Sequence, residues 1–265
     1  MKTNYFRSMG AALALLALVT MPQAFAQQAA KPSGNLSGVW LLSGGTGVGG
    51  GNASLSRRPQ TQWSTEMLPF SSEGMKILQS NKSGKGPRQV VAALGNDPIG
   101  KANPYGLYRT LVYGRPFEFV QVGDKVLQVF ELGRNWRAIY TDGRPVPDDV
   151  PAGPYWYGYS VGHWEGDTLV VTTLGLDERA WMDEWGTPLG ADARYVERWQ
   201  RIAPDRIQLT MTVTAPSLYS KPWTSSPVMY TLQKKDIEPQ EVIFAPIDEA
   251  EFNEDIRDPA GLPKK

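Results

Sequence analysis

The segment that decides the fold of this chain is residues 155–173, YWYGYSVGHWEGDTLVVTT. Two runs rich in aromatic and β-branched residues flank Glu165-Gly166-Asp167, and glycine supplies the positive φ that a tight hairpin turn requires. The segment therefore predicts two antiparallel strands joined at this turn. The first strand carries His163, the only histidine in the chain.

Alternation of apolar and polar residues recurs on both sides of this hairpin. It predicts further strands at residues 35–42, 117–122, 125–131, 136–140, 194–202, 206–214 and 228–232. Many short strands separated by turn signals are typical of an all-β barrel or sandwich. We also expect one or two short helices, one of them within residues 67–80 with Ser71 or Ser72 as its N-cap.

The first residues have the pattern of a signal peptide. Lys2 and Arg7 precede the short apolar run 11–19, and Ala24-Phe25-Ala26 matches a small-x-small cleavage site. The run is too short for a permanent transmembrane helix. We expect cleavage after Ala26, a periplasmic or secreted protein, and no membrane insertion after cleavage.

The rest of the chain is predicted to form one β-barrel domain over residues 35–247. A polar tether, residues 27–34, precedes it, and a loose tail, residues 248–265, follows it. Six glycines within residues 44–51 predict a loop, because the β-α-β context of a nucleotide site is missing.

Charge balance and aromatic content indicate which kind of molecule the protein binds. The chain has 27 basic and 27 acidic residues, which argues against a nucleic-acid-binding protein. It has no cysteine, but it has nine Trp, eleven Tyr and eight Phe. Aromatic side chains line small-molecule pockets, so the expected partner is a small apolar or aromatic molecule. We expect neither a metal ion nor a cofactor, and the sequence does not indicate an oligomeric state.

Gly38-Val39-Trp40 is similar to the opening strand of lipocalins and related small barrels. In those proteins the tryptophan closes one end of the barrel beneath an arginine from a late strand. The resemblance implies that Arg198 or Arg201 packs on Trp40. The alternative is that Trp40 is an ordinary core residue.

A wider resemblance runs from about residue 86 to 232. Segments 138–145, 158–171, 181–183, 197–201 and 219–224 resemble a large family of exported bacterial proteins, and GYSVGHWEGDTLVV is the most specific match. The resemblance implies a lipocalin-like antiparallel barrel. That family often has histidine at the positions of Val146, Leu189 and Tyr195 and aspartate at Thr172. A metal or proton-transfer site formed there in relatives would be absent from this chain.

Alternation places His163 on the same strand face as Tyr157 and Tyr159. If this face points into the barrel, the three side chains form a proton-transfer set. The long segment 174–192 can fold over them and contribute a tryptophan and a carboxylate. We therefore predict a site at the barrel mouth with catalytic His163, Tyr159 and Asp183, and with substrate-binding Tyr140, Arg144, Tyr157 and Trp181. The alternative is a surface histidine and a solvated acidic loop.

Three functions fit these features. The first is an exported, cofactor-free lyase, isomerase or dehydratase acting on a small apolar or aromatic compound. The second is a non-catalytic carrier of such a compound, and the third is a structural envelope protein without a ligand. Converging Tyr, His and carboxylate groups would favour the enzyme, an apolar pocket the carrier, and a filled barrel the structural protein.

Overall fold

The computed structural model describes residues 34–43, 55, 58–101, 103–150, 153–234 and 239–240. The predicted signal peptide 1–26, glycine-rich loop 44–51 and tail 248–265 lie outside these residues, as does the predicted tether apart from Gly34.

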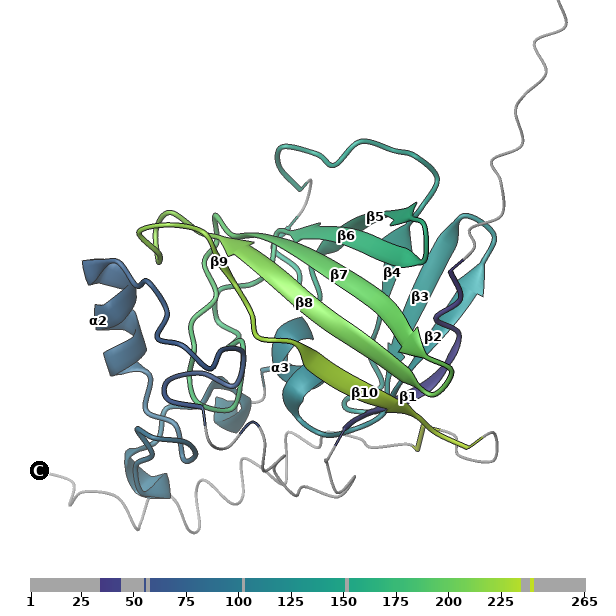
Figure 1. Ribbon diagram of the computed structural model, residues 1–265. Helices are drawn as coiled ribbons and strands as arrows, with labels where there is room; N and C mark the ends of the chain where they lie inside the picture. The colour runs from purple at the N-terminus through teal and green to yellow at the C-terminus, as the bar shows by residue number, and fades with distance from the viewer. Residues whose placement is uncertain are drawn as a thin grey trace, which may run out of the picture. The chain divides into compact units, whose positions relative to one another are not determined.

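Within the described residues, nine strands close into a β-barrel (Figure 1). They are β1 (Gly38–Leu42), β2 (Phe117–Val122), β3 (Lys125–Phe130), β4 (Trp136–Tyr140), β5 (Tyr159–Glu165), β6 (Thr168–Leu174), β7 (Arg194–Ala203), β8 (Arg206–Thr214) and β10 (Val228–Leu232). The barrel closes because β10 pairs with both β8 and β1. A short further strand, β9 (Trp223–Thr224), pairs with the end of β8. The prediction of an all-β barrel is confirmed.

Two α-helices accompany the barrel in the described part of the chain. Helix α2 (Ser72–Ser80) begins where predicted, and the Ser71 hydroxyl accepts a hydrogen bond from the Gly74 N–H. Helix α3 (Leu107–Val112) is buried along its whole length. Two 3₁₀ turns, η1 (Ala92–Leu94) and η2 (Pro98–Lys101), lie between them in sequence.

One strand pair departs from the predicted antiparallel pattern. Among the described strand pairs, only β4 and β5 run parallel, and they align at just two positions, Ile139 with Ser160 and Tyr140 with Val161. A parallel neighbour requires a crossover connection, and its described parts are residues 141–150 and 153–158. The crossover arches above β5 and β6 in Figure 1. We call this short parallel contact the seam.

Aromatic rings fill the barrel interior. Phe117 contacts Phe119, Phe130, Trp199 and Tyr230, with ring centroids 5.1 to 6.1 Å apart. All five side chains are almost wholly buried. These inward positions alternate with outward ones along each strand, as barrel geometry requires. The interior is therefore a packed core rather than an open calyx.

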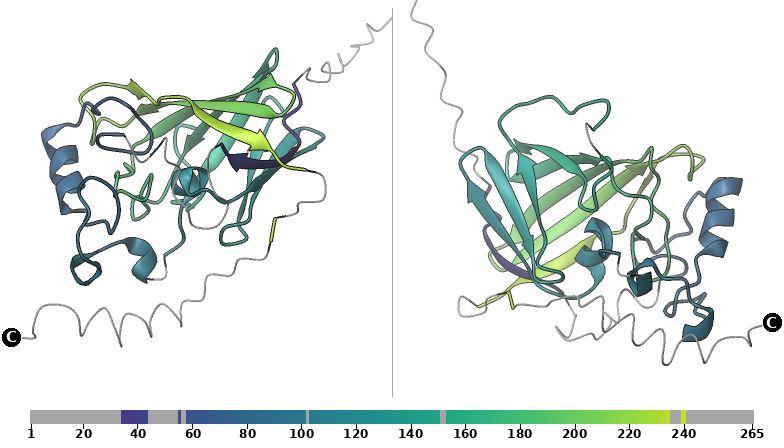
Figure 2. Two further views of the ribbon diagram at one scale, coloured as in Figure 1. Left: turned by 60° about the horizontal axis from the view of Figure 1, so that its bottom comes forward. Right: turned by 180° about the vertical axis from the view of Figure 1, so that it is seen from behind.

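Both ends of the barrel are covered. At one end the Arg201 guanidinium lies 5.4 Å from the ring centroid of Trp40, and Trp40 Nε1 donates to the carbonyl of Leu36. The predicted Trp40–arginine contact is thus confirmed, with Arg201 as the partner. Towards the other end of β7, α3 inserts Tyr108, whose ring lies 4.4 Å from that of Tyr195. Figure 2 shows α3 at this opening.

Candidate binding site

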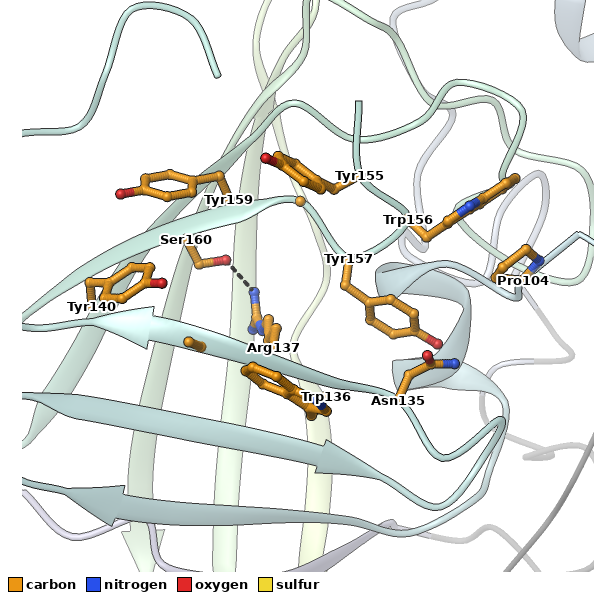
Figure 3. A pocket seen from close by; sticks show the side chains of 12 residues that line it. Pro104, Asn135, Trp136, Arg137, Tyr140, Tyr155, Trp156, Tyr157, Tyr159 and Ser160 are labelled. Atoms are coloured by element: carbon orange, nitrogen blue, oxygen red, sulfur yellow. Dashed lines mark hydrogen bonds between the residues drawn. The ribbon is translucent and has the colours of Figure 1, made fainter. Parts of the chain in front are cut away.

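A cleft of about 470 Å³ opens in the barrel wall at the seam. Because β4 and β5 pair only at their two aligned positions, the segments that precede them diverge. The cleft is lined by residues 135–138, Tyr140 and residues 155–160, with Pro104 at its edge. Figure 3 shows these side chains around the gap between the two strands.

Aromatic side chains dominate the lining. Six of the lining residues are aromatic: Trp136, Tyr140, Tyr155, Trp156, Tyr157 and Tyr159. Tyr155 and Tyr159 lie on the β5 side of the gap, and Trp136 and Tyr140 lie on the β4 side (Figure 3). Trp136 is 62% exposed, which is unusual for a residue of its size. The lining on both sides of the gap is thus largely aromatic.

Gly158 gives the lining its shape. Its φ of +66° interrupts the extended backbone, and a Cβ there would come within 2.6 Å of Thr173 Cγ2. The strand therefore begins only at Tyr159, and Tyr157 turns inward against Phe130, with ring centroids 5.4 Å apart. The expectation that Tyr157 continues the Tyr159 face of the strand is wrong for this reason.

The inner end of the cleft is polar. Arg137 Nη1 lies 3.3 Å from Ser160 Oγ, which in turn is 3.0 Å from Thr173 Oγ1. The Arg137 guanidinium also forms a two-pronged ion pair with Glu197, with Nη1–Oε1 at 2.9 Å and Nη2–Oε2 at 2.6 Å. Its Nε donates to Gln128 Oε1. All these side chains are buried, so this polar group is fixed by its own hydrogen bonds.

Glu197 is held as a carboxylate. Burial raises its pKa, but the charge and hydrogen bonds of Arg137 and of the other donors outweigh burial, so the pKa lies below its ordinary value of 4.5. Its other donors are Tyr108 Oη, Thr173 Oγ1 and Trp199 Nε1. Both carboxylate oxygens are therefore occupied, and Glu197 positions Arg137 instead of moving protons.

Three of the predicted site residues meet at the rim of the cleft. The Arg144 guanidinium lies 3.8 Å from the ring centroid of Tyr140, and its Nη1 donates to Tyr159 Oη at 3.0 Å. The rings of Tyr140 and Tyr159 are 5.6 Å apart. Asp142 holds Arg144 from the other side, with Nη2–Oδ2 at 2.6 Å. This cluster lies on the barrel wall at the seam and not at the barrel mouth, where we expected it.

His163 lies outside the barrel. Its side chain is 66% exposed, and Nε2 is 3.2 Å from Glu165 Oε1. The inward positions of β5 are Ser160 and Gly162, because their partners on β6, Thr173 and Val171, are fully buried. His163 therefore shares the outer face with Tyr159, as in the alternative of a surface histidine, and the proton-transfer set that an inward face would have formed is not present.

Asp183 and Trp181 also lie apart from the cleft lining. The Asp183 side chain is fully buried, and Trp181 is buried beside the Arg109 guanidinium, 5.7 Å from ring centroid to cation. The Asp183 carboxylate accepts hydrogen bonds from Thr61 Oγ1, Gln62 N, Trp185 N, Thr187 N and Thr187 Oγ1. Through these hydrogen bonds Asp183 holds the segments 61–62 and 185–187 together. The structure does not bring His163, Tyr159 and Asp183 together.

Sequence reasoning missed Trp136, Ser160 and Glu197 as members of this site. A signal existed for Glu197, because it stands at an inward position between Tyr195 and Trp199 in the alternation of its strand. A charged residue at such a position needs a buried partner, and Arg137 is one.

The fold and cleft define the class of this protein as a closed, aromatic-filled β-barrel with a cleft in its wall. Comparison with protein-family models and with curated proteins finds no match for the chain. In the described ranges, no group of three or more His, Asp or Glu side chains is placed to hold a metal ion. No helix in those ranges has the length and apolar character needed to cross a membrane.

Proposed function

We propose that this protein binds a small aromatic compound in the seam cleft and acts as an exported carrier or sequestering protein for it. The observation that favours this function is the set of aromatic side chains around a fixed polar group, Arg137 and Ser160. Export rests on the predicted signal peptide. The expected family membership remains a proposal as well.

The ligand ring stacks between the two aromatic sides of the cleft. Offset or edge-to-face contacts between rings add about 0.5–1.5 kcal/mol each to the burial of apolar surface. A hydroxyl or carbonyl group of the ligand pairs with the polar inner end, near Ser160. Apolar walls with a few fixed polar groups are the usual composition of small-molecule sites.

Binding is favoured over turnover because the expected proton-transfer groups do not converge. His163 is on the outer face, Asp183 is enclosed by its donors, and Glu197 is already paired. The filled interior alone would favour a structural protein. The exposed Trp136 beside a wall cleft instead favours a ligand.

A titration tests the proposal. The exported protein is titrated with phenol, indole, 2-naphthol and benzoate, and binding is followed by calorimetry and tryptophan fluorescence. Trp136→Ala should weaken binding of the best compound about tenfold. Met67→Ala is the matched control, because Met67 is similarly exposed, at 64%, and does not line the cleft. Absence of binding by all four compounds, or equal weakening by both variants, would overturn the proposal.

A further inference from the structure

A second groove adjoins the cleft on the outer face of the barrel. Its volume is about 480 Å³, and Val122, Lys125 and Leu127 line it together with Trp136, Ala138 and Tyr140. The last three residues also line the seam cleft. The two spaces therefore meet across the outer face of β4.

On the outer face of β2, β3 and β4 the central aligned row, Val120, Leu127 and Ala138, is wholly apolar. The two rows beside it each contain one charged residue, Glu118 in one and Lys125 in the other. The solvent-facing side of an antiparallel sheet is ordinarily polar. Here the one charged group in the groove is Lys125, whose Nζ lies 5.5 Å from the ring centroid of Tyr140.

Ala138 determines how the two spaces connect. Alternation places it on the outer face of β4 between Trp136 and Tyr140. Its methyl group is the smallest side chain of the three, so the passage from cleft to groove runs over it. The passage then extends over about two strand spacings, roughly 10 Å, towards Val122.

We propose that cleft and groove form one elongated site, and that the ligand is an amphiphile with an aromatic head and a short alkyl tail. This inference rests on the proposed function. The head occupies the seam cleft, and the tail crosses Ala138 and lies over Leu127. An alkyl tail is the occupant that suits the groove, because the groove is continuous with the aromatic cleft and has apolar walls.

The test is a series of phenols with tails of increasing length: phenol, 4-ethylphenol, 4-butylphenol and 4-hexylphenol. Each buried methylene should raise the affinity of the wild-type protein about two- to fourfold, because it removes apolar surface from water. The gain should level off once the tail extends beyond Val122. Equal affinities along the series would overturn the elongated site, whereas failure of every phenol to bind would overturn the proposed function itself.

Two groove variants test whether the alkyl tail binds in the groove or is attracted non-specifically to apolar surface elsewhere. Val122→Asp should remove the gain with tail length and leave phenol affinity unchanged. Ile202→Asp is its matched control, because both side chains are exposed strand residues, at 56% and 46%, and Ile202 lies outside the groove. Ala138→Leu should block the passage and also remove the gain with tail length; because Ala138 lines the cleft as well, this variant is judged by the change of affinity along the series and not by its affinity for phenol.

Retention of the tail-length gain in both groove variants would overturn the inference. Sedimentation measures whether Val122→Asp has lost self-association. If it has, and if affinity still rises with tail length, the face binds a second copy of the chain and the inference is overturned. Thermal unfolding of each variant verifies that it is folded before titration.

Discussion

The Arg137 guanidinium and the Glu197 carboxylate meet inside the barrel with Nη2 2.6 Å from Oε2, and both side chains are buried. Arg137 belongs to β4 and Glu197 to β7, so the pair connects strands that are not neighbours in the sheet. A buried pair of this kind adds little net stability over an apolar pair, but losing one partner leaves the other charge uncompensated.

Removing one partner should therefore be costly. Glu197→Gln is expected to lower the free energy of unfolding by about 3–5 kcal/mol, as measured by urea denaturation. Glu165→Gln, which breaks the exposed pair with Arg198, is the control and should have little effect. The double variant Arg137→Met/Glu197→Met should lose less free energy of unfolding than Arg137→Met and Glu197→Met lose when their separate losses are added. A loss equal to that sum would contradict the pairing.

The lowered pKa of Glu197 predicts how stability depends on pH. A carboxyl group with a depressed pKa in the folded state contributes stability above its unfolded pKa of about 4.5, and this contribution is lost as pH falls through the folded pKa. The wild-type protein should lose more stability than Glu197→Gln as pH falls below about 4.5. Parallel curves for the two proteins in urea denaturation across this window would contradict the shift.

Gly158 should be sensitive to substitution for two reasons. Gly158→Ala places a Cβ at positive φ, which costs about 1–2 kcal/mol, and also brings it within 2.6 Å of Thr173 Cγ2. Gly123 has a similar φ of +58° with nothing near a Cβ, so Gly123→Ala reports the backbone cost alone. Thermal unfolding should show the larger loss for Gly158→Ala, and the seam ligand should bind it more weakly because Tyr157 and Tyr159 shift.

Trp40 should be a major source of stability. Trp40→Ala is expected to cost about 3–5 kcal/mol, since it leaves a large cavity beneath Arg201. Denaturant unfolding measures this loss, with Trp136→Ala as a comparison that removes an exposed tryptophan. An unchanged midpoint for Trp40→Ala would contradict its role in closing the barrel.

His163 should be dispensable for binding. His163→Phe is expected to leave both ligand affinity and stability nearly unchanged, because the side chain is exposed and lies on the outer face. Calorimetric titration at pH 5.5 and 7.5 should give equal affinities for a neutral phenol. Loss of binding in this variant would place the histidine in the site after all.

Alternation predicted most of the barrel. Strands β2, β4 and β10 begin and end at the residues expected, and the Ser71 cap of α2 was readable from local sequence. Alternation states which residues share a face but not which face is inside. On β5, aromatic residues occupy both faces, so apolar character did not decide between an inward and a surface His163.

The sequence predicted part of the candidate site: Tyr140, Tyr157 and Tyr159 line the cleft, and Arg144 lies at its rim. It did not predict Trp136 and Ser160, because their place in the cleft depends on β4 lying beside β5. That pairing is parallel and depends on the crossover, for which local patterns give no signal.

The short seam has a consequence for how the chain assembles. Strands β2 to β4 form one series of antiparallel neighbours, and β5 to β8 form another. Contacts between sequence neighbours form early, because little chain entropy is lost in closing short loops. We therefore expect each antiparallel series to form before the two series pair at the seam. On this expectation Arg137 and Glu197, one from each series, come together only when the cleft forms.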